Sequence, residues 1–262
     1  VGEGVKTHKV GDSVAFFKGF GAFAEKIVLS EALAFSIPDN FPHPVAAGVF
    51  MVYGTSYHAL VQRAKITKDD EVLVLGASGG VGLAAVDIAK SFGARVVVAV
   101  STKEKADVCS RYGVDDVVVY GKEKLDQEGQ KIFTKELKSK STRGGFSIIY
   151  DPIGDCFAEP ALRSIGWGGT YLVVGFAAGK IPSFPTNLML LKGCAVSGVF
   201  IGRFQQEEPK QSAQNIKEIG DLLSSGKLTP FISETIPMAK SIDAIERIAK
   251  RGVVGKVVFV NN

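Results

Sequence analysis

Four closely spaced glycines form the part of this 262-residue sequence that points most directly to a chemical role. They are Gly76, Gly79, Gly80 and Gly82, and Ser78 and Val81 lie among them. Glycine lets the backbone turn sharply and lets a phosphate group approach the main chain. A helix that begins here would offer unpaired N–H groups and a positive dipole end to a pyrophosphate. The predicted contacts are therefore Ser78, Gly79, Gly80, Val81 and Gly82; the alternative is a glycine-rich turn in an α/β domain that binds no nucleotide.

The residues after Val100 predict which dinucleotide is bound. Ser101, Thr102 and Lys105 follow an apolar run, and no acidic residue occupies the tip itself, where a carboxylate would accept from the ribose 2′-hydroxyl of NADH. Hydroxyl and ammonium groups suit a 2′-phosphate instead. We therefore predict NADPH as the cofactor. The alternative is that Lys103 and Lys105 only belong to an exposed helix start.

A βαβ unit is needed to position these groups. Glu71–Leu75 is a short apolar run that predicts a buried parallel strand, and Arg95–Val100 predicts the next one. Between them, Gly79–Phe92 predicts a helix with one buried face, formed by Val81, Ala85, Ile88 and Phe92.

The alternation of strands and helices continues to about residue 225. Strands are predicted at 116–120, 146–151, 170–176 and 194–200, and helices at 104–112, 125–139, 157–164 and 209–225. In the second of these helices, Ile132, Phe133 and Leu137 are predicted to face inward. This order predicts an α/β fold with a doubly wound parallel sheet covered on both faces.

The two ends of the chain read differently. Strands are predicted at 1–5, 13–17 and 22–29, followed by a helix over 46–64 that is broken near Gly54 and Thr55. The tail predicts a strand at 232–236, a helix at 241–251 and a strand at 256–260. The first residue, Val1, already lies within an apolar, strand-like pattern. We therefore expect that the chain is a fragment or has lost an N-terminal segment.

Composition narrows the class of protein. The net charge is +4, with lysines and acidic residues interleaved, so no nucleic-acid partner is expected. Cys109, Cys156 and Cys194 have no metal-like spacing, which predicts reduced thiols in the cytoplasm or the mitochondrial matrix. No apolar run reaches membrane-spanning length and no signal peptide is visible, so no membrane insertion is expected.

Several motifs occur together in the order typical of one superfamily. They are VGDSV at 10–14, FGAFAE at 20–25, TSYHAL at 55–60, GASGGVG at 76–82, YDPIG at 150–154 and GKVV at 255–258. With these motifs the chain resembles the medium-chain dehydrogenase/reductase superfamily. Within it, the chain is most similar to the zinc-free, zeta-crystallin-like quinone oxidoreductases, and in particular to the quinone oxidoreductase-like proteins. The resemblance covers essentially the whole chain.

The resemblance implies a two-domain fold. Residues 54–224 would form a Rossmann domain, and residues 1–53 with 225–262 would form a GroES-like catalytic domain that is incomplete at its N-terminal side. The cleft between them would hold the nicotinamide and the substrate. The run 194–200 would pair with its counterpart in a second chain, which gives a homodimer.

The resemblance also implies roles for individual residues. Backbone groups of Gly175, Phe176, Val199 and Phe200 would hold the nicotinamide carboxamide, Tyr120 would contact the 2′-phosphate, Thr55 would place a hydroxyl near the nicotinamide, and Tyr57 is a candidate proton donor. The alternatives are core packing for Phe176 and Phe200, strand-end packing for Tyr120, and a helix N-cap for Thr55.

No metal site is predicted. Zinc-dependent relatives carry a cysteine four residues before the threonine of the TSYHAL-type motif, and this position is Met51 here, a poor zinc ligand. His8, His43 and His58 are scattered, and His58 is read as a packed or capping histidine.

Three functions remain open at this point. The first is NADPH-dependent reduction of a quinone or activated enone without zinc. The second is reduction of another carbonyl or acyl substrate on the same fold. The third is a non-catalytic, NADPH-binding structural or regulatory protein, as the lens crystallins of this family illustrate.

Overall fold

A parallel six-stranded sheet is the centre of the larger of two compact units. The computed structural model describes residues 1–38, 41–250 and 252–261, and it divides into one unit of Val1–Met51 with Phe231–Asn262 and a second of Val52–Pro230. The boundaries predicted from the sequence were 53/54 and 224/225. The assignment of the smaller unit as a GroES-like domain stays a prediction.

The sheet has the strand order of a doubly wound fold. Its strands are β3 (Glu71–Leu75), β4 (Arg95–Val100), β5 (Asp116–Val119), β6 (Phe146–Asp151), β7 (Ile165–Val173) and β8 (Ala195–Gly198). They lie in the order β5-β4-β3-β6-β7-β8, and every neighbouring pair is parallel. This order confirms the predicted Rossmann fold.

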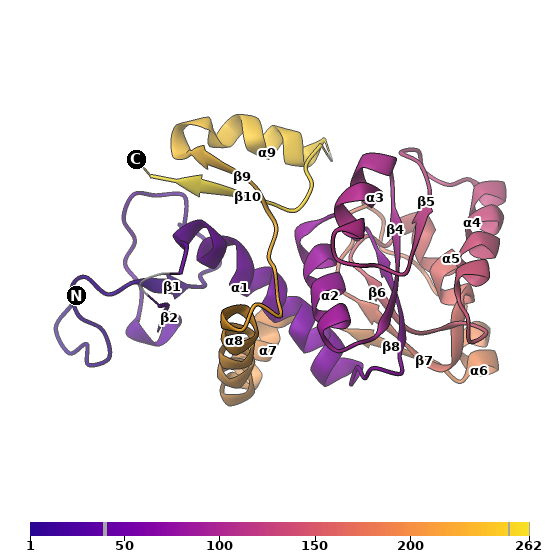
Figure 1. Ribbon diagram of the computed structural model, residues 1–262, viewed down its shortest axis with the longest axis horizontal. Helices are drawn as coiled ribbons and strands as arrows, with labels where there is room; N and C mark the ends of the chain where they lie inside the picture. Colours follow the sequence, from indigo (N-terminus) through magenta and orange to yellow (C-terminus); the bar gives the residue numbers. More distant parts are fainter. Residues whose placement is uncertain (39–40, 251, 262) are drawn as a thin grey trace. The chain divides into compact units, whose positions relative to one another are not determined.

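Helices cover both faces of the sheet. Figure 1 shows α2 (Gly80–Ser91) and α3 (Lys103–Ser110) on one face, and α4 (Gln127–Lys140) and α5 (Ala158–Arg163) on the other. The remaining helices of the unit are η2 (His58–Arg63), η3 (Asp155–Phe157), α6 (Thr186–Lys192), α7 (Ile201–Glu207) and α8 (Pro209–Ser224). The sequence patterns missed α6 and α7, which are short.

Two predictions about buried helix faces were wrong. In α2, Leu83, Ala84, Val86 and Asp87 are buried along with Ala85 and Ile88, so the helix has no single buried stripe. In α4, Phe133 and Leu137 are buried as predicted, but Ile132 is 59% exposed. A helix turns 100° per residue, so adjacent Ile132 and Phe133 cannot both point at the centre of one narrow contact.

The core between the sheet and α4 and α5 is almost entirely apolar. Leu73, Leu75, Val97, Ala99 and Val118 project from the strands toward Phe133, Leu137, Phe157 and Leu162. Each large side chain buried in this way contributes about 1.5–3 kcal/mol to stability. The sheet is therefore a rigid base for the loops that follow its strands.

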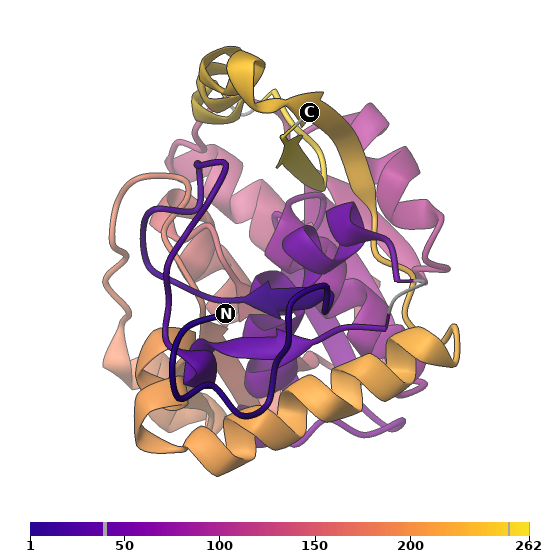
Figure 2. The ribbon, with the colours of Figure 1, turned by 90° about the vertical axis from the view of Figure 1, so that its left-hand side faces the viewer.

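The described residues of the smaller unit form two separate strand pairs. β1 (Val14–Phe16) is antiparallel to β2 (Ala34–Ser36), with η1 (Glu31–Leu33) before β2. β9 (Ile232–Pro237) is parallel to β10 (Lys256–Val260), with η4 (Met238–Lys240) and α9 (Ser241–Ala249) between them. Figure 2 shows the two pairs as separate ribbons, in indigo and in yellow.

Several predicted strands and element boundaries were wrong. The ranges 1–5 and 22–29 form no strand, and α1 (His43–Tyr57) runs unbroken through Gly54 and Thr55 before it continues as η2, a π-helical segment. Strand β7 ends at Val173, not at 176. Arg251, the predicted end of the last helix, lies outside the described residues.

A buried carboxylate on α2 joins both ends of the larger unit. The Asp87 Oδ2 atom accepts hydrogen bonds from the Tyr53 hydroxyl at 2.6 Å and from the Thr229 amide at 2.7 Å. The Tyr112 hydroxyl donates to the Thr229 carbonyl at 2.9 Å. Tyr53 and Thr229 thus contact one oxygen atom, although they lie at opposite ends of the segment Val52–Pro230.

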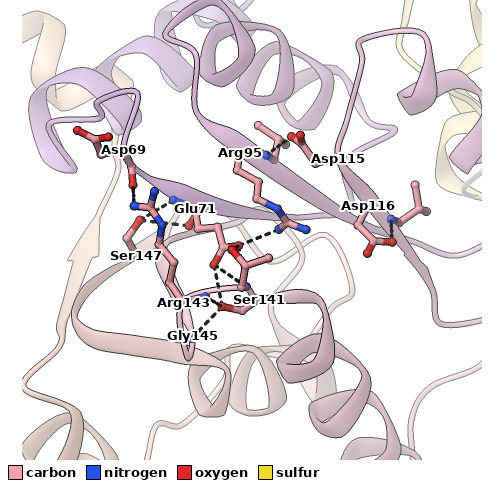
Figure 3. Close-up of polar contacts among 12 residues, drawn as sticks. Asp69, Glu71, Arg95, Asp115, Asp116, Ser141, Arg143, Gly145 and Ser147 are labelled. Carbon is pink, nitrogen blue, oxygen red and sulfur yellow. Dashed lines mark hydrogen bonds and ion pairs between the residues drawn. The ribbon is translucent and has the colours of Figure 1, made fainter.

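A second buried carboxylate fastens the starts of the central strands. Glu71 opens β3 and is only 1% exposed; its carboxylate accepts from Arg95 at 2.9 Å, from the Ser141 hydroxyl at 2.7 Å and from the Thr142 amide at 2.9 Å (Figure 3). Burial alone would raise the pKa of Glu71, but these donors outweigh it and the pKa is lowered.

The Glu71 network makes a prediction about stability. Glu71→Gln keeps the shape but loses the charge that pairs with Arg95, and its NH2 group cannot accept the hydrogen bonds that one carboxylate oxygen accepts, so we expect about 2–3 kcal/mol lower free energy of unfolding at pH 7. Because the folded-state pKa is depressed, this difference should shrink as the pH falls below about 4.3, the ordinary value for glutamate. Urea unfolding at several pH values measures it.

A matched control is Glu128→Gln. Glu128 pairs with Lys131 across one turn of α4, with both side chains more than two-thirds exposed. We expect a change of at most about 0.5 kcal/mol there. An equal loss of stability in both variants, or a Glu71→Gln effect that does not depend on pH, would contradict the network's role.

Candidate functional site: the carboxyl edge of the sheet

The candidate site lies where the order of the sheet reverses. β3 and β6 are neighbours, but the chain moves from β3 outward to β4 and β5 before it returns to β6. The loops after β3 and β6 therefore diverge toward opposite faces, and α/β proteins bind ligands in the crevice outside such a point. Here the two loops are 76–79 and 152–154.

Close packing of the surrounding atoms explains why positions 76 and 82 are glycine. A Cβ on Gly82 would lie 2.6 Å from the Gly76 carbonyl oxygen and 2.7 Å from the Ala77 Cα atom, both backbone atoms. Gly76 has a φ of +56°, and a Cβ there would lie 2.5 Å from the Ile153 side chain. The glycines thus bring the first turn of α2 directly against the end of β3 and against the loop after β6.

The start of α2 has the features of an anion site. Its N-cap residue is Gly79, which has no side chain to cap the helix, and the Gly79 amide donates to the Gly76 carbonyl at 3.1 Å. Gly79, Gly80 and Val81 are each partly exposed. Free N–H groups, a positive dipole end and no covering side chain are what a pyrophosphate requires, so the residues fit that group.

The tip of β4 gathers the polar groups predicted there. Thr102 is the N-cap of α3 and accepts from the Lys105 amide at 3.4 Å, while the Lys105 ammonium donates to the Ser101 hydroxyl at 3.1 Å. The Thr102 hydroxyl and the backbone amide of Glu104 lower the pKa of Glu104, and the charges of Lys122 and Lys103 lower it further. Lys122, which sequence reasoning missed, therefore lies close enough to add positive charge to this tip.

Tyr120 lies beside this tip but packs inward. Its amide donates to the Val100 carbonyl at 3.0 Å, which places its backbone next to the end of β4. Its ring is 4.5 Å from that of Phe157 and 5.7 Å from that of Phe133, between ring centroids. The ring contacts agree with the packing alternative, and contact with a 2′-phosphate stays a prediction.

The loops after β7 and β8 continue the same edge. The Val199 amide donates to the Val173 carbonyl at 2.9 Å. Gly175 follows the end of β7, and Phe176 is 39% exposed beside Gly154. Phe200 is 74% exposed, so the core-packing alternative for Phe200 was wrong. The two backbone segments predicted to hold a carboxamide are thus neighbours.

Thr55 is connected to the glycine loop through the residue that follows it. It is buried inside α1, so the N-cap alternative was wrong: the helix begins twelve residues earlier, at His43. The Ser56 hydroxyl donates to the Val81 carbonyl at 2.9 Å and lies 2.8 Å from the Tyr150 hydroxyl. Ser56 and Tyr150, which sequence reasoning did not assign a role, therefore attach α1 to the first turn of α2.

Tyr57 is a predicted site residue whose hydroxyl points away from the glycine loop. Its hydroxyl donates to Glu218 at 2.7 Å, and burial, followed by Glu218, raises its pKa. It lines a pocket of about 310 Å³ together with Ser91 and Phe92, at the opposite end of α2. Because α2 has twelve residues, this end lies about 18 Å from the glycines. The position does not support a role for Tyr57 as proton donor.

The described residues offer no fit for zinc. Among residues 1–38, 41–250 and 252–261, no group of three or more His, Cys, Asp or Glu side chains could hold a metal ion. His58 is buried, with its ring stacked on Phe204 at 3.9 Å between centroids.

Within the same ranges, no helix has the length and apolar character that crossing a bilayer requires.

Known proteins are similar to this chain in sequence and in fold. The family profile described as "Zinc-binding dehydrogenase" matches residues 80–218. The Bos taurus protein named "Quinone oxidoreductase-like protein 2" is 32% identical over 260 residues, which cover 98% of this chain and 72% of the relative.

Two solved structures are similar as well. The Escherichia coli quinone oxidoreductase, solved with NADPH, superimposes with a TM-score of 0.88 at 24% identity, over 99% of this chain and 78% of that one. A mycobacterial protein solved with NADPH gives 0.79 at 25% identity, over 87% and 68%.

The fold and the glycine loop thus define a dehydrogenase of the Rossmann class. The chain belongs to the medium-chain dehydrogenase/reductases, in their quinone oxidoreductase-like family, and it is an oxidoreductase. The zinc in the family profile's description has no counterpart in the described residues.

The contact at Gly82 makes a prediction. Gly82→Ala places a Cβ against backbone that has no flexible end to move, so we expect a loss of about 1–3 kcal/mol in the free energy of unfolding. Gly220→Ala is the matched control, because this glycine also lies inside a helix but has open space around it. It should raise stability by about 0.5–1 kcal/mol. Urea unfolding distinguishes the two, and a neutral Gly82→Ala would contradict the close approach.

Proposed function

We propose that the chain is an NADPH-dependent oxidoreductase that transfers hydride to a quinone or an activated enone without zinc. The observation that carries the proposal is the uncapped start of α2, held against β3 at the reversal point of the sheet and followed by a hydroxyl- and ammonium-bearing tip at β4. The NADPH complexes of the two solved relatives support the same cofactor.

Different residues at this edge would bind different parts of the cofactor. Backbone amides of Gly79, Gly80, Val81 and Gly82, with Ser78, would bind the pyrophosphate. Ser101, Thr102 and Lys105, with Tyr120 beside them, would bind the 2′-phosphate. Gly175, Phe176, Val199 and Phe200 would hold the nicotinamide end, with Thr55 close to it.

The chemistry itself needs little from side chains. Bound NADPH supplies a hydride, and the protein orients the acceptor and excludes water. Quinones and enones are electrophilic enough to accept hydride without a Lewis acid, which agrees with a site that lacks zinc ligands in the described residues. The name of the Bos taurus relative supports a quinone-type acceptor.

Stopped-flow NADPH oxidation with a panel of acceptors tests the function, and Lys105 tests the choice of cofactor. We expect quinones or enones to oxidise NADPH at a rate that a metal chelator does not change.

Lys105→Glu should lower the preference for NADPH over NADH at least about tenfold, because a carboxylate repels the 2′-phosphate. Lys135→Glu, an equal charge change at an exposed position of α4, is the control.

The outcomes separate the alternatives. Oxidation only by aldehydes or acyl substrates would favour another reductase on this fold. NADPH binding with no oxidation by any acceptor would favour a non-catalytic protein. Tighter binding of NADH than of NADPH by the unaltered chain would contradict the role given to the β4 tip.

We also propose a homodimer that forms through β8. This strand ends the sheet and pairs with β7 on its inner side, and Leu190 and Leu191 of the preceding helix α6 are more than two-thirds exposed. An edge strand beside apolar side chains favours pairing with a second copy. Light scattering should give the mass of two chains at micromolar concentration, and Ala195→Lys, at an exposed position of β8, should give that of one. A monomer in both cases would contradict the proposal.

A further inference from the structure

Asp151 combines deep burial with a central place in the candidate site. It is the last residue of β6, at the point where the order of the sheet reverses, and it is only 2% exposed. Among the described residues it takes part in no ion pair. A buried carboxylate without a cation is stable only if hydrogen bonds compensate its charge, so the donors that surround it show what it holds.

One carboxylate oxygen closes the turn after β6. The Asp151 Oδ1 atom accepts from the amides of Ile153 and Gly154, each at 2.8 Å. This fixes a turn in which Gly154 and Asp155 have left-handed φ angles of +64° and +53°. The Ile153 side chain then lies directly over Gly76, where an added Cβ would be only 2.5 Å away. The carboxylate thus holds the turn 152–154 in contact with the start of the glycine loop.

The main chain of the same residue attaches the loop after β7. The Asp151 carbonyl accepts from the amides of Val174 at 2.9 Å and Gly175 at 3.3 Å. Phe176, the next residue, lies beside Gly154, where a Cβ would be 3.0 Å from its ring. Asp151 therefore bonds directly to the segment proposed to hold the nicotinamide end, and it reaches the glycine loop through Ile153, which lies over Gly76.

The other carboxylate oxygen has a separate partner. The Tyr171 hydroxyl donates to Asp151 Oδ2 at 2.6 Å, and Tyr171 is itself fully buried in β7. Burial raises the pKa of Asp151, and the two amides and Tyr171 oppose that shift. This bond joins two strands of the core and touches neither loop. Oδ1 thus closes the turn after β6, while Oδ2 joins β6 to β7, and substitutions can separate the two contacts.

We propose that Asp151 is a positioning residue for the cofactor: by holding the turn 152–154 against Gly76 and the segment 174–175 beside it, it sets the spacing between the pyrophosphate end and the nicotinamide end of the crevice. This inference rests on the proposed function, because it assigns the crevice to NADPH.

Three variants test it. Asp151→Ala removes the acceptor for both amides and for Tyr171. Asp151→Asn is the conservative variant, because its amide oxygen can accept from both backbone N–H groups while its NH2 group donates to the Tyr171 oxygen. Tyr171→Phe is the matched control, since it removes the bond to Oδ2 and a long contact of 3.5 Å to the Ala158 carbonyl, and leaves both bonds that close the turn.

The readouts are the Kd for NADPH by fluorescence titration, the Tm, and hydrogen exchange of the amides of 76–82 in the free chain. Asp151→Ala should raise the Kd at least about tenfold, the size expected when charge-assisted hydrogen bonds that fix a binding loop are lost. Its amides at 76–82 should exchange faster. Asp151→Asn should stay within about threefold of the unaltered chain. Tyr171→Phe should lower the Tm with the Kd and the exchange rates unchanged.

Two results would overturn the inference. One is an Asp151→Ala variant that folds and binds NADPH as the unaltered chain does. The other is a Tyr171→Phe variant whose Kd rises as much as that of Asp151→Ala, since this would reduce Asp151 to a contributor to stability. If the unaltered chain binds no NADPH, the proposed function fails instead, and the exchange rates at 76–82 still show whether Asp151 positions the glycine loop.

Discussion

The contact between the first turn of α2 and the end of β3 is the constraint on which the site depends. Gly82 lies so close to the backbone of Gly76 and Ala77 that no side chain fits between them. This approach directs the start of the helix, and its unpaired amides, toward the carboxyl edge of the sheet. Two other elements of the site contact this helix or the loop before it: Ser56 bonds to its first turn, and Ile153 lies over Gly76.

Buried carboxylates form hydrogen bonds at both ends of the central strands. Glu71 joins the start of β3 to β4 and to the loop before β6, while Asp151 joins the end of β6 to the loop after β7. Between these two carboxylates the strands are mostly apolar, and the hydroxyls of Tyr150 and Tyr171 add hydrogen bonds within the core. Apolar burial thus gives the domain its stability, and a few charged hydrogen bonds at the ends of the strands determine where the loops go.

Much of the larger unit could be predicted from the sequence because its signals are local. The runs Glu71–Leu75, Arg95–Val100 and Phe146–Asp151 are apolar and bounded by glycine or polar residues, and each is a strand with the predicted ends. The glycine spacing likewise depends on backbone geometry within one loop. For these features, sequence-local physics is sufficient.

Features that depend on tertiary contacts were missed. Nothing in the pattern around Tyr57 tells toward which end of α2 its hydroxyl points, because that depends on Glu218, far along the chain. The exposure of Ile132 depends on the width of the groove that α4 fills. Asp151 could have been noticed, since an acidic residue that ends an apolar strand must find donors, but its partners Tyr171 and Gly154 are known only from the fold.

The shared acceptor on α2 has a consequence for how this chain is assembled. Tyr53 and Thr229 stand next to the two points where the chain enters and leaves the larger unit, and both bond to the same atom of Asp87. The segment 52–230 is therefore a unit whose entrance and exit are adjacent, which is the geometry that lets one domain be inserted within the chain of another. The chain enters this unit inside α1 and leaves it after Thr229, and one oxygen atom with two donors holds these two points together.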